Sequence, residues 1–347
     1  MKTYSLKISA IIFLSLIFTS VFSQTEFTKN FEKKYSVNEN TLFKITNKYG
    51  NVNIENSNSN TLEIFVTISI NTKNKEKADN FFKKIAVNFD KSGDVISAET
   101  EIKENLKAKN FSINYHIIMP EKLKIELYNK YGDIFIDKLK SNSVILCKYG
   151  NLKINELLTG ELSKSATVNL KYSNGNISKC DYVKADIKYS EMTIDESRVL
   201  NLTSGYSKLH LGKSYIIQGT SKYDPIYSVD EVTKFIMEGK YSDYKIDQLG
   251  NTLKVKIGYS NFKINNTSDN FSDIYIVGSY GNIKINVNKN ASYKFNAKAE
   301  YGDISSLVKT VATEHGLTKL SSGFAGDNEN SKSKITIVSK YGDIDVK

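Results

Sequence analysis

The side chains that most often perform catalysis or bind metals are few and scattered in this sequence. Its three histidines, His116, His210 and His315, are far apart in the chain. No spacing among them matches a metal-ligand pattern or pairs a base with a nucleophile. We therefore expect no catalytic residue, no metal site and no cofactor.

Acidic residues recur at one place but do not predict catalysis. Asp133, Asp303 and Asp343 each stand two residues after a tyrosine, and asparagine takes the same place at Asn51 and Asn151. A position that accepts either residue suits a side-chain hydrogen bond at a turn better than a nucleophile or a base. The nine-residue glycine and aspartate repeat of calcium-binding β-rolls is absent.

Lysines recur immediately before the same tyrosines and form a candidate polyanion stripe. Its members are Lys130, Lys148, Lys171, Lys188, Lys222 and Lys240. Alternation along a strand would point all of them outward. They form either a solvated face that keeps strand edges unpaired or a basic stripe that touches acidic glycans or lipopolysaccharide phosphates.

The tyrosines themselves mark an internal repeat. They are Tyr49, Tyr131, Tyr149, Tyr172, Tyr189, Tyr206, Tyr223, Tyr241, Tyr259, Tyr280, Tyr301 and Tyr341. From Tyr131 to Tyr301 they recur at nearly regular steps, and a fixed period of about 20 residues indicates a stacked repeat architecture.

Each repeat unit predicts a strand, a corner and a second short strand. Leu123, Ile125 and Leu127 alternate with polar residues before Tyr131, and apolar residues resume three and five positions after it. This odd step requires a turn, which we place at the glycine or serine and the asparagine or aspartate that follow each tyrosine. Parity then predicts an internal ladder of tyrosines whose hydroxyls bind corner backbone groups; an exposed aromatic stripe that binds sugars is the alternative.

The predicted fold is therefore all-β: a single-stranded parallel β-solenoid, or right-handed β-helix, with about 17–21 residues per coil. Residues 1–23 read as a secretory signal peptide, with Lys2 and Lys7 before an apolar core. Residues 24–120 are expected to form a β-rich N-terminal capping region with one helix at about 75–86. Residues 121–347 are expected to form the solenoid, with a long loop at about 312–333.

The amino-acid composition limits the classes of partner that the protein is expected to bind. The formal net charge is +10, and Arg198 is the only arginine among 48 basic residues. Base-specific recognition favours the planar fork of arginine, so a sequence-reading nucleic-acid protein is excluded. Cys147 and Cys180 are expected to be buried free thiols; a disulfide between coils is the alternative.

The sequence resembles a known family in residues that have a structural role. These are the segment Tyr115–Pro120 before Leu123, the helix at 75–86, the repeated Tyr-Gly-Asp/Asn-Ile phrases and the glycine-rich stretch before the last copy. They resemble the adhesin-like bacterial β-strand-repeat proteins, also called the auto-transporter adhesin head domain. The resemblance implies an exported β-solenoid of unknown function with no established catalytic residues.

Two functions follow from these observations. The first is an exported, non-enzymatic solenoid of the bacterial cell envelope, adhesin-like or scaffolding, which contacts envelope glycans or protein partners. It would be periplasmic, exposed on the outer surface or secreted, without a transmembrane segment. The alternative is a carbohydrate-active enzyme on a β-helix, like the polysaccharide lyases. The oligomeric state is not predicted.

Overall fold

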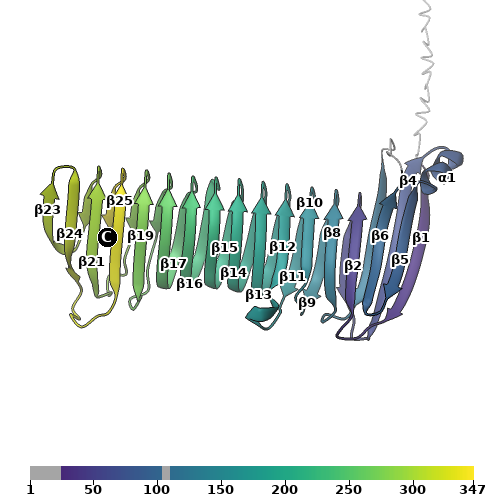
Figure 1. Ribbon diagram of the computed structural model, residues 1–347, viewed down its shortest axis with the longest axis horizontal. Coiled ribbons are helices and arrows are strands. Elements are labelled where there is room, and N and C mark those ends of the chain that lie inside the picture. The colour runs from purple at the N-terminus through teal and green to yellow at the C-terminus, as the bar shows by residue number, and fades with distance from the viewer. Residues whose placement is uncertain (1–24, 104–109) are drawn as a thin grey trace, which may run out of the picture.

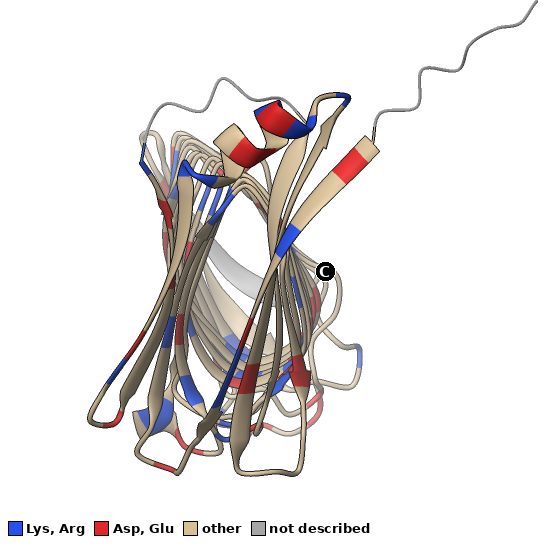
Figure 2. Cartoon of the chain, turned by 90° about the vertical axis from the view of Figure 1, so that its right-hand side faces the viewer, with Lys and Arg blue, Asp and Glu red and all other residues tan. Residues whose placement is uncertain are grey.

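The computed structural model describes residues 25–103 and 110–347. The expected signal peptide, residues 1–23, lies outside the described residues. The described chain is almost entirely β-structure, and its 26 strands are joined by hydrogen bonds into one open, mixed sheet that bends into two facing layers (Figures 1 and 2). None of the helices in this part of the chain is long and apolar enough to span a membrane.

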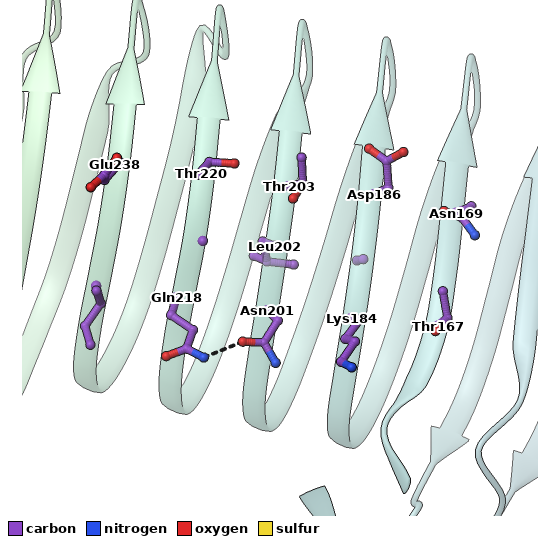
Figure 3. A pocket seen from close by; sticks show the side chains of 13 residues that line it. Thr167, Asn169, Lys184, Asp186, Asn201, Leu202, Thr203, Gln218, Thr220 and Glu238 are labelled. Carbon is purple, nitrogen blue, oxygen red and sulfur yellow. Dashed lines mark hydrogen bonds between the residues drawn. The ribbon is translucent and has the colours of Figure 1, made fainter. Parts of the chain in front are cut away.

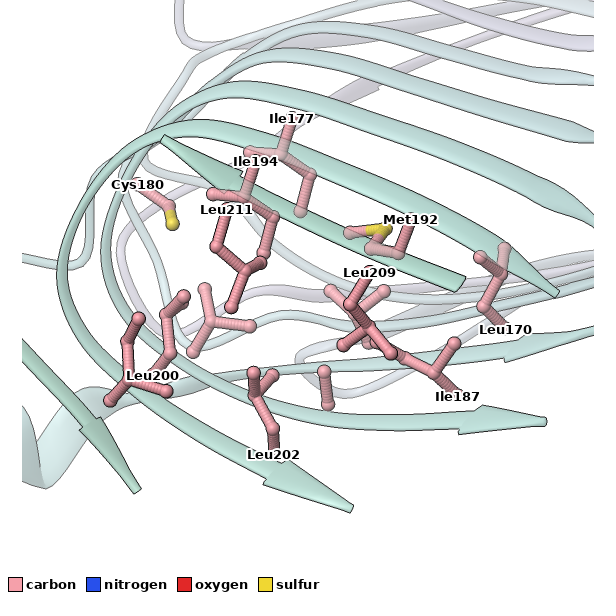
Figure 4. Close-up of a cluster of buried hydrophobic side chains, with 14 of the residues drawn as sticks. Leu170, Ile177, Cys180, Ile187, Met192, Ile194, Leu200, Leu202, Leu209 and Leu211 are labelled. Atoms are coloured by element: carbon pink, nitrogen blue, oxygen red, sulfur yellow. The ribbon is translucent and has the colours of Figure 1, made fainter. Parts of the chain in front are cut away.

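The middle of the molecule has the simplest construction. Five long strands each bend halfway, so that the first half lies in one layer and the second half in the other (Figure 4). Each pairs in parallel with the next, in a register that places Ile187 beside Ser204 and Leu209 beside Tyr227. These strands are β13 (Asn174–Lys188), β14 (Glu191–Gly205), β15 (Lys208–Lys222), β16 (Ile226–Lys240) and β17 (Tyr244–Gly258).

One layer, here called the lysine layer, contains the strands that end at the repeated tyrosines. From the N-terminal end of the stack its order is β5 (Ile85–Ser92), β6 (Val95–Ile102), β2 (Leu42–Lys48), β8 (Lys124–Lys130), β10 (Val144–Lys148), β12 (Ala166–Lys171), the second halves of β13 to β17, β19 (Asp273–Ser279), β25 (Lys334–Lys340), β21 (Tyr293–Glu300), β24 (Thr318–Ala325) and β23 (Lys309–His315).

The opposite layer contains the strands that follow the tyrosines. Its order is β1 (Thr25–Ser36), β4 (Thr61–Thr72), β7 (Phe111–Met119), β3 (Val52–Asn56), β9 (Ile134–Leu139), β11 (Asn151–Leu157), the first halves of β13 to β17, β18 (Phe262–Ile264), β20 (Ile283–Ile285), β26 (Ile344–Val346) and β22 (Ile304–Ser306).

The core is a continuous apolar column between the two layers. Alternate residues point inward along each strand, because side chains of a strand project to opposite faces in turn. Met192 and Leu209 occupy matching places in β14 and β15, as do Ile194 and Leu211 (Figure 4). All four are buried, so each coil covers the apolar face of the next, as the repeat predicts.

The ends of the stack depart from the pure parallel coil that the sequence predicts. The antiparallel pairs β1–β4, β4–β7 and β5–β6 lie at the N-terminal end, and β21–β24 and β23–β24 at the C-terminal end. The expected long loop at 312–333 is therefore wrong as far as Ala325, because it contains the end of β23 and the whole of β24. Its glycines and serines resemble a loop, but the edge of β21 offers backbone partners that order them as a strand.

The helix α1 (Lys75–Phe82) begins where the sequence predicts. Asn74 caps it by accepting a hydrogen bond from the backbone N–H of Lys77 at 3.2 Å. The helix ends before the predicted end, since Ile85 joins β5 and is buried in the sheet. α1 lies at the N-terminal end of the stack (Figure 1), where the ring of its Phe81 packs against that of Phe111 with centroids 5.1 Å apart. A short 3₁₀ turn at Leu162–Lys164 is the other helical segment of the described chain.

The two cysteines are free and buried. Burial raises the pKa of Cys147 to about 11 and that of Cys180 to about 12. Both thiols therefore stay protonated near neutral pH and pack as small apolar side chains.

A candidate binding edge of stacked tyrosines and lysines

The twelve repeated tyrosines, here called the corner tyrosines, form one continuous column along an edge of the molecule. Neighbouring ring centroids are 4.5–5.1 Å apart and the ring planes differ by only 2–18°. The spacing is that of the strands beneath, about 4.8 Å. Within the column both faces of each ring are therefore covered by neighbouring rings, and ring edges and hydroxyls reach solvent. The two end rings, Tyr49 and Tyr301, stack on one tyrosine each.

The column is external, so the predicted internal ladder is wrong. Eleven of the corner tyrosines are 39–52% exposed. Every corner tyrosine has a left-handed backbone, with φ between 51° and 64°. The turn thus begins at the tyrosine itself, and this reverses the side to which its ring points. The turn therefore lies one residue earlier than the alternation of residue types predicts, and the tyrosine is not part of a straight strand.

A left-handed backbone costs a tyrosine on the order of 1 kcal/mol, and two kinds of contact offset that cost. Stacking contributes about 0.5–1.5 kcal/mol for an aromatic pair. The backbone ladder also continues through the corner: the amide of Tyr131 donates to the carbonyl of Lys148 at 3.0 Å, and that of Tyr149 to Lys171 at 3.2 Å.

The residue after each tyrosine turns inward and seals the corner. In the outer coils it is glycine, because the backbones approach closely: a Cβ on Gly132 would lie 2.0 Å from the carbonyl oxygen of Gly50. In the middle coils it is serine, whose hydroxyl accepts the backbone N–H of the preceding corner, as Ser190 does from Ser173 at 3.2 Å.

The residue two positions after each corner tyrosine makes the hydrogen bond that the sequence predicts at the corner. Asn51 Oδ1 accepts the backbone N–H of Asp133 at 2.9 Å, and Asp133 Oδ1 accepts that of Asn151 at 2.7 Å. Asn261 Oδ1 accepts the N–H of Asn282 at 3.1 Å in the same way. Asp133 thus has a structural role in the hydrogen bonds of the corner, as its interchange with asparagine in the repeat indicates.

Three lysines of the predicted stripe lie against the rings of the column. Lys130 Nζ lies 4.6 Å from the ring centroid of Tyr131, and Lys148 Nζ lies 5.0 Å from that of Tyr149. Lys222 makes the same contact with Tyr223 at 5.2 Å. Each of these ammonium groups lies within the distance of about 6 Å at which a cation is attracted to an aromatic ring.

Most of this row has no internal counter-ion. Lys188 pairs with Asp186 at 3.3 Å. The other five lysines of the predicted stripe form no ion pair within the described chain. They are Lys130, Lys148, Lys171, Lys222 and Lys240.

One residue of the corner was missed by sequence reasoning. Asp224 follows Tyr223 where the middle coils have serine, and it is fully buried. Its carboxylate accepts hydrogen bonds from Ser204 Oγ at 2.5 Å and from the backbone N–H of Ser207 at 2.8 Å. Burial raises the pKa of this carboxyl above its ordinary value, although these hydrogen bonds lower it in part. The sequence does contain a signal for this residue, because Asp224 occupies the repeat position that is serine in the neighbouring coils.

Among the described residues, no three His, Cys, Asp or Glu side chains are placed to hold a metal ion. His116 lies 3.7 Å from Glu55, and His210 contacts Ser228 Oγ at 2.9 Å. These two histidines are thus held apart in the fold as they are in the sequence.

Comparison with known proteins finds a similarity for the C-terminal third of the chain. Residues 228–347 match the family model Toastrack DUF4097. This is a domain of unknown function, and the resemblance to an adhesin-like family of unknown function is confirmed at this level. No curated protein matches the sequence.

Several crystal structures resemble the chain at low identity. A "putative cell adhesion protein" from Clostridium sporogenes is 13% identical, with 92% of this chain and 99% of that chain covered and a TM-score of 0.18. A "putative adhesin" from Parabacteroides distasonis is 12% identical, with 75% and 93% covered and a TM-score of 0.32. A "putative lipid binding protein" from the same species is 9% identical, with 92% and 96% covered and a TM-score of 0.31.

Proposed function

We propose that this protein is an exported, non-enzymatic, adhesin-like or scaffolding component of the bacterial cell envelope. In this proposal residues 1–23 direct export, residues 24–120 cap a right-handed coil, and the edge formed by the corner tyrosines and the lysine row binds acidic polymers. The ligands would be acidic glycans or phosphate-bearing envelope polymers.

The observation that carries the proposal is the row of uncompensated lysines beside a rigid aromatic column. Like charges on neighbouring strands repel one another, and Lys130, Lys148 and Lys171 follow one another on consecutive strands without a carboxylate partner. An extended polyanion lying along the edge would relieve that repulsion and, within an uninterrupted run such as these three strands, meet a positive charge at about every 4.8 Å.

The tyrosine column supports the same ligand class. Because the ring faces are stacked on each other, they are closed to the flat stacking by which aromatic side chains often hold sugars. What remains accessible is a line of ring edges and hydroxyls beside ammonium groups. This surface suits hydrogen bonding to carboxylates or phosphates better than stacking of neutral sugar rings.

The test is binding of alginate, as an acidic polysaccharide, with dextran as the neutral control. We expect saturable alginate binding that weakens strongly as NaCl is raised, because charge attraction at an exposed surface is screened by salt. The triple variant Lys130→Gln, Lys148→Gln, Lys222→Gln should weaken binding at least about tenfold.

The matched control neutralises three exposed lysines away from the column: Lys153→Gln, Lys213→Gln and Lys263→Gln. An equal loss of alginate affinity in both triple variants would mean that net charge alone explains the binding. It would overturn the proposed binding edge. Absence of alginate binding at low salt would overturn it as well, as would binding that salt does not change.

A further inference from the structure

The lysine layer has a second surface feature, a shallow hollow of about 620 Å³ that extends across β12 to β16. Its size lies within the range of small-molecule sites, about 300–1,000 Å³. The hollow lies on the outer face of the layer (Figure 3), and neither a corner tyrosine nor a lysine of the predicted stripe lines it. Nothing in the proposed function uses it.

Two rows of side chains, most of them short and polar, line the hollow, one member from each strand. Their spacing follows the strands, about 4.8 Å from one member to the next. One row contains Thr167, Lys184, Asn201, Gln218 and Ile236, and the other Asn169, Asp186, Thr203, Thr220 and Glu238.

Many of these groups are free to bind a ligand. Gln218 Nε2 donates to Asn201 Oδ1 at 2.5 Å, which leaves the other amide atom of each side chain for a partner. The hydroxyls of Thr203 and Thr220 are exposed and face outward from neighbouring strands (Figure 3). Together they offer donors and acceptors at a regular interval along the stack.

The backbone at the floor of the hollow requires glycine. Gly219 has φ of 151°, and a Cβ there would lie 1.8 Å from the carbonyl oxygen of Leu202 on the neighbouring strand. One carboxylate oxygen at the rim, Asp186 Oδ1, is shielded from solvent and receives no hydrogen bond from the described chain. Close backbone packing therefore fixes the floor of the hollow.

Charge distinguishes the hollow from the lysine row. Gly205 interrupts that row on β14, where the hollow lies. Asp186 is paired with Lys188 at 3.3 Å, and Lys184 and Glu238 carry opposite charges. The hollow is thus close to neutral, which disfavours a polyanion there.

A peptide is a poor occupant as well. The strands that line the hollow lie within the layer, so their backbone groups are already paired and cannot add another strand. A neutral chain rich in hydroxyls matches the row of amides and hydroxyls.

We propose that this hollow is a binding site for a linear neutral glycan whose chain runs along the stack, across the strands. The site is independent of the charged edge and of the function proposed for it. Several linked sugar units would fit along five strands, which together extend about 19 Å between the first and the last.

The experiment titrates the protein with four neutral hexasaccharides: cellohexaose, β-1,4-mannohexaose, laminarihexaose and maltohexaose. Binding is measured by calorimetry at low and high NaCl. We expect saturable binding of at least one of them with the same affinity at both salt concentrations, since the ligand carries no charge.

The double variant Thr203→Val, Thr220→Val keeps shape and strand propensity but removes two hydroxyls, and it should weaken that binding at least about tenfold. The matched control, Thr46→Val with Thr336→Val, changes outward threonines of the same layer outside the hollow and should leave affinity within about twofold. Thr203→Tyr, which fills the hollow with a good strand former, should abolish binding and serves if the double variant fails to fold.

Saturation by none of the four sugars would overturn the proposal. Equal affinity of the two double variants would overturn it too. Binding that falls with salt and is lost in the Lys130, Lys148 and Lys222 triple variant would assign the ligand to the charged edge and remove the hollow as a site. Failure of alginate binding has no bearing on this result, so the two proposals can fail separately.

Discussion

Tyr280 stacks on Tyr341, which lies near the C-terminal end of the chain, and does not stack on the next corner tyrosine in the sequence, Tyr301. The ring centroids of Tyr280 and Tyr341 are 4.7 Å apart, and Tyr341 lies at the same distance from Tyr301 on its other face. The last full strand of the chain, β25, thus lies between β19 and β21 (Figure 1). The last segment of the chain is therefore inserted between two strands that precede it in the sequence, and it does not extend the end of the stack.

Tyr341 should therefore contribute more than Tyr301 to the free energy of unfolding. Tyr341→Asn removes two stacking contacts and Tyr301→Asn removes one, while asparagine tolerates the left-handed backbone at either place. At about 0.5–1.5 kcal/mol per aromatic pair, we expect Tyr341→Asn to cost about 1–3 kcal/mol and Tyr301→Asn about half as much. Thermal unfolding measures both variants, and equal losses would contradict the inserted order of the column.

The glycine that follows a corner tyrosine should not accept a side chain. A Cβ on Gly281 would lie 2.0 Å from the carbonyl oxygen of Ser260, so Gly281→Ala must force two backbones apart. Overpacking of this kind costs about 1–3 kcal/mol or more. The control is Gly205→Ala, whose Cβ would meet its nearest atom, the carbonyl oxygen of Lys222, at 3.5 Å.

Gly205→Ala should be neutral or stabilising by up to about 1 kcal/mol, because it restricts the unfolded chain. Thermal unfolding again gives the comparison, and hydrogen exchange at the amides next to residue 281 would locate the damage. A harmless Gly281→Ala would show that the corners are less tightly stacked than the structure indicates.

Asp224 should make stability depend on pH in an unusual direction. Its pKa is higher in the folded chain than in the unfolded chain. Between those two pKa values the folded state holds a proton that the unfolded state has released, so stability at this site falls as pH rises through that window. Below the unfolded pKa the penalty is absent.

Asp224→Asn removes this charge and keeps both hydrogen-bond positions. Its stability relative to the wild type should therefore increase as the pH rises from about 3.5 to about 7, as measured by urea unfolding at each pH. The exposed Asp230→Asn variant controls for loss of a negative charge. A difference that does not change with pH would contradict a buried carboxylate whose pKa is raised.

The cysteines should be inert while the protein is folded. Cys147 and Cys180 are buried, and the pKa values of about 11 and about 12 leave almost no thiolate at neutral pH. We expect mass spectrometry to find no alkylation by N-ethylmaleimide under native conditions and two alkylated thiols after denaturation without a reductant. A protein that needs a reductant for alkylation would contain a disulfide instead.

Much of the architecture could be predicted from the sequence. The period of the tyrosines predicts stacked coils because each coil has one apolar face that only a neighbour can cover. Alternation on either side of the corner identifies the inward residues correctly, among them Leu127 and Ile134, which are both fully buried. The interchange of Asp133 with Asn51 correctly predicts a hydrogen bond at the corner.

Two features of the fold depend on geometry that the sequence pattern alone does not contain. The position of each tyrosine ring depends on a single left-handed residue, and one such residue reverses the side on which a side chain lies without changing the sequence period. The insertion of β25 depends on the strand edges left open by β19 and β21, neither of which is its neighbour in the sequence.

The sequence by itself thus determined the repeat, the apolar interior and the row of lysines, because these follow from the alternation of residue types along each strand. Only the tertiary structure decided that the tyrosines are outside, that three lysines of the row lie against tyrosine rings without counter-ions, and that five neighbouring strands form a neutral hollow. Those features arise where residues from successive repeats meet across adjacent coils, and their backbone geometry and charges act together only in the folded chain.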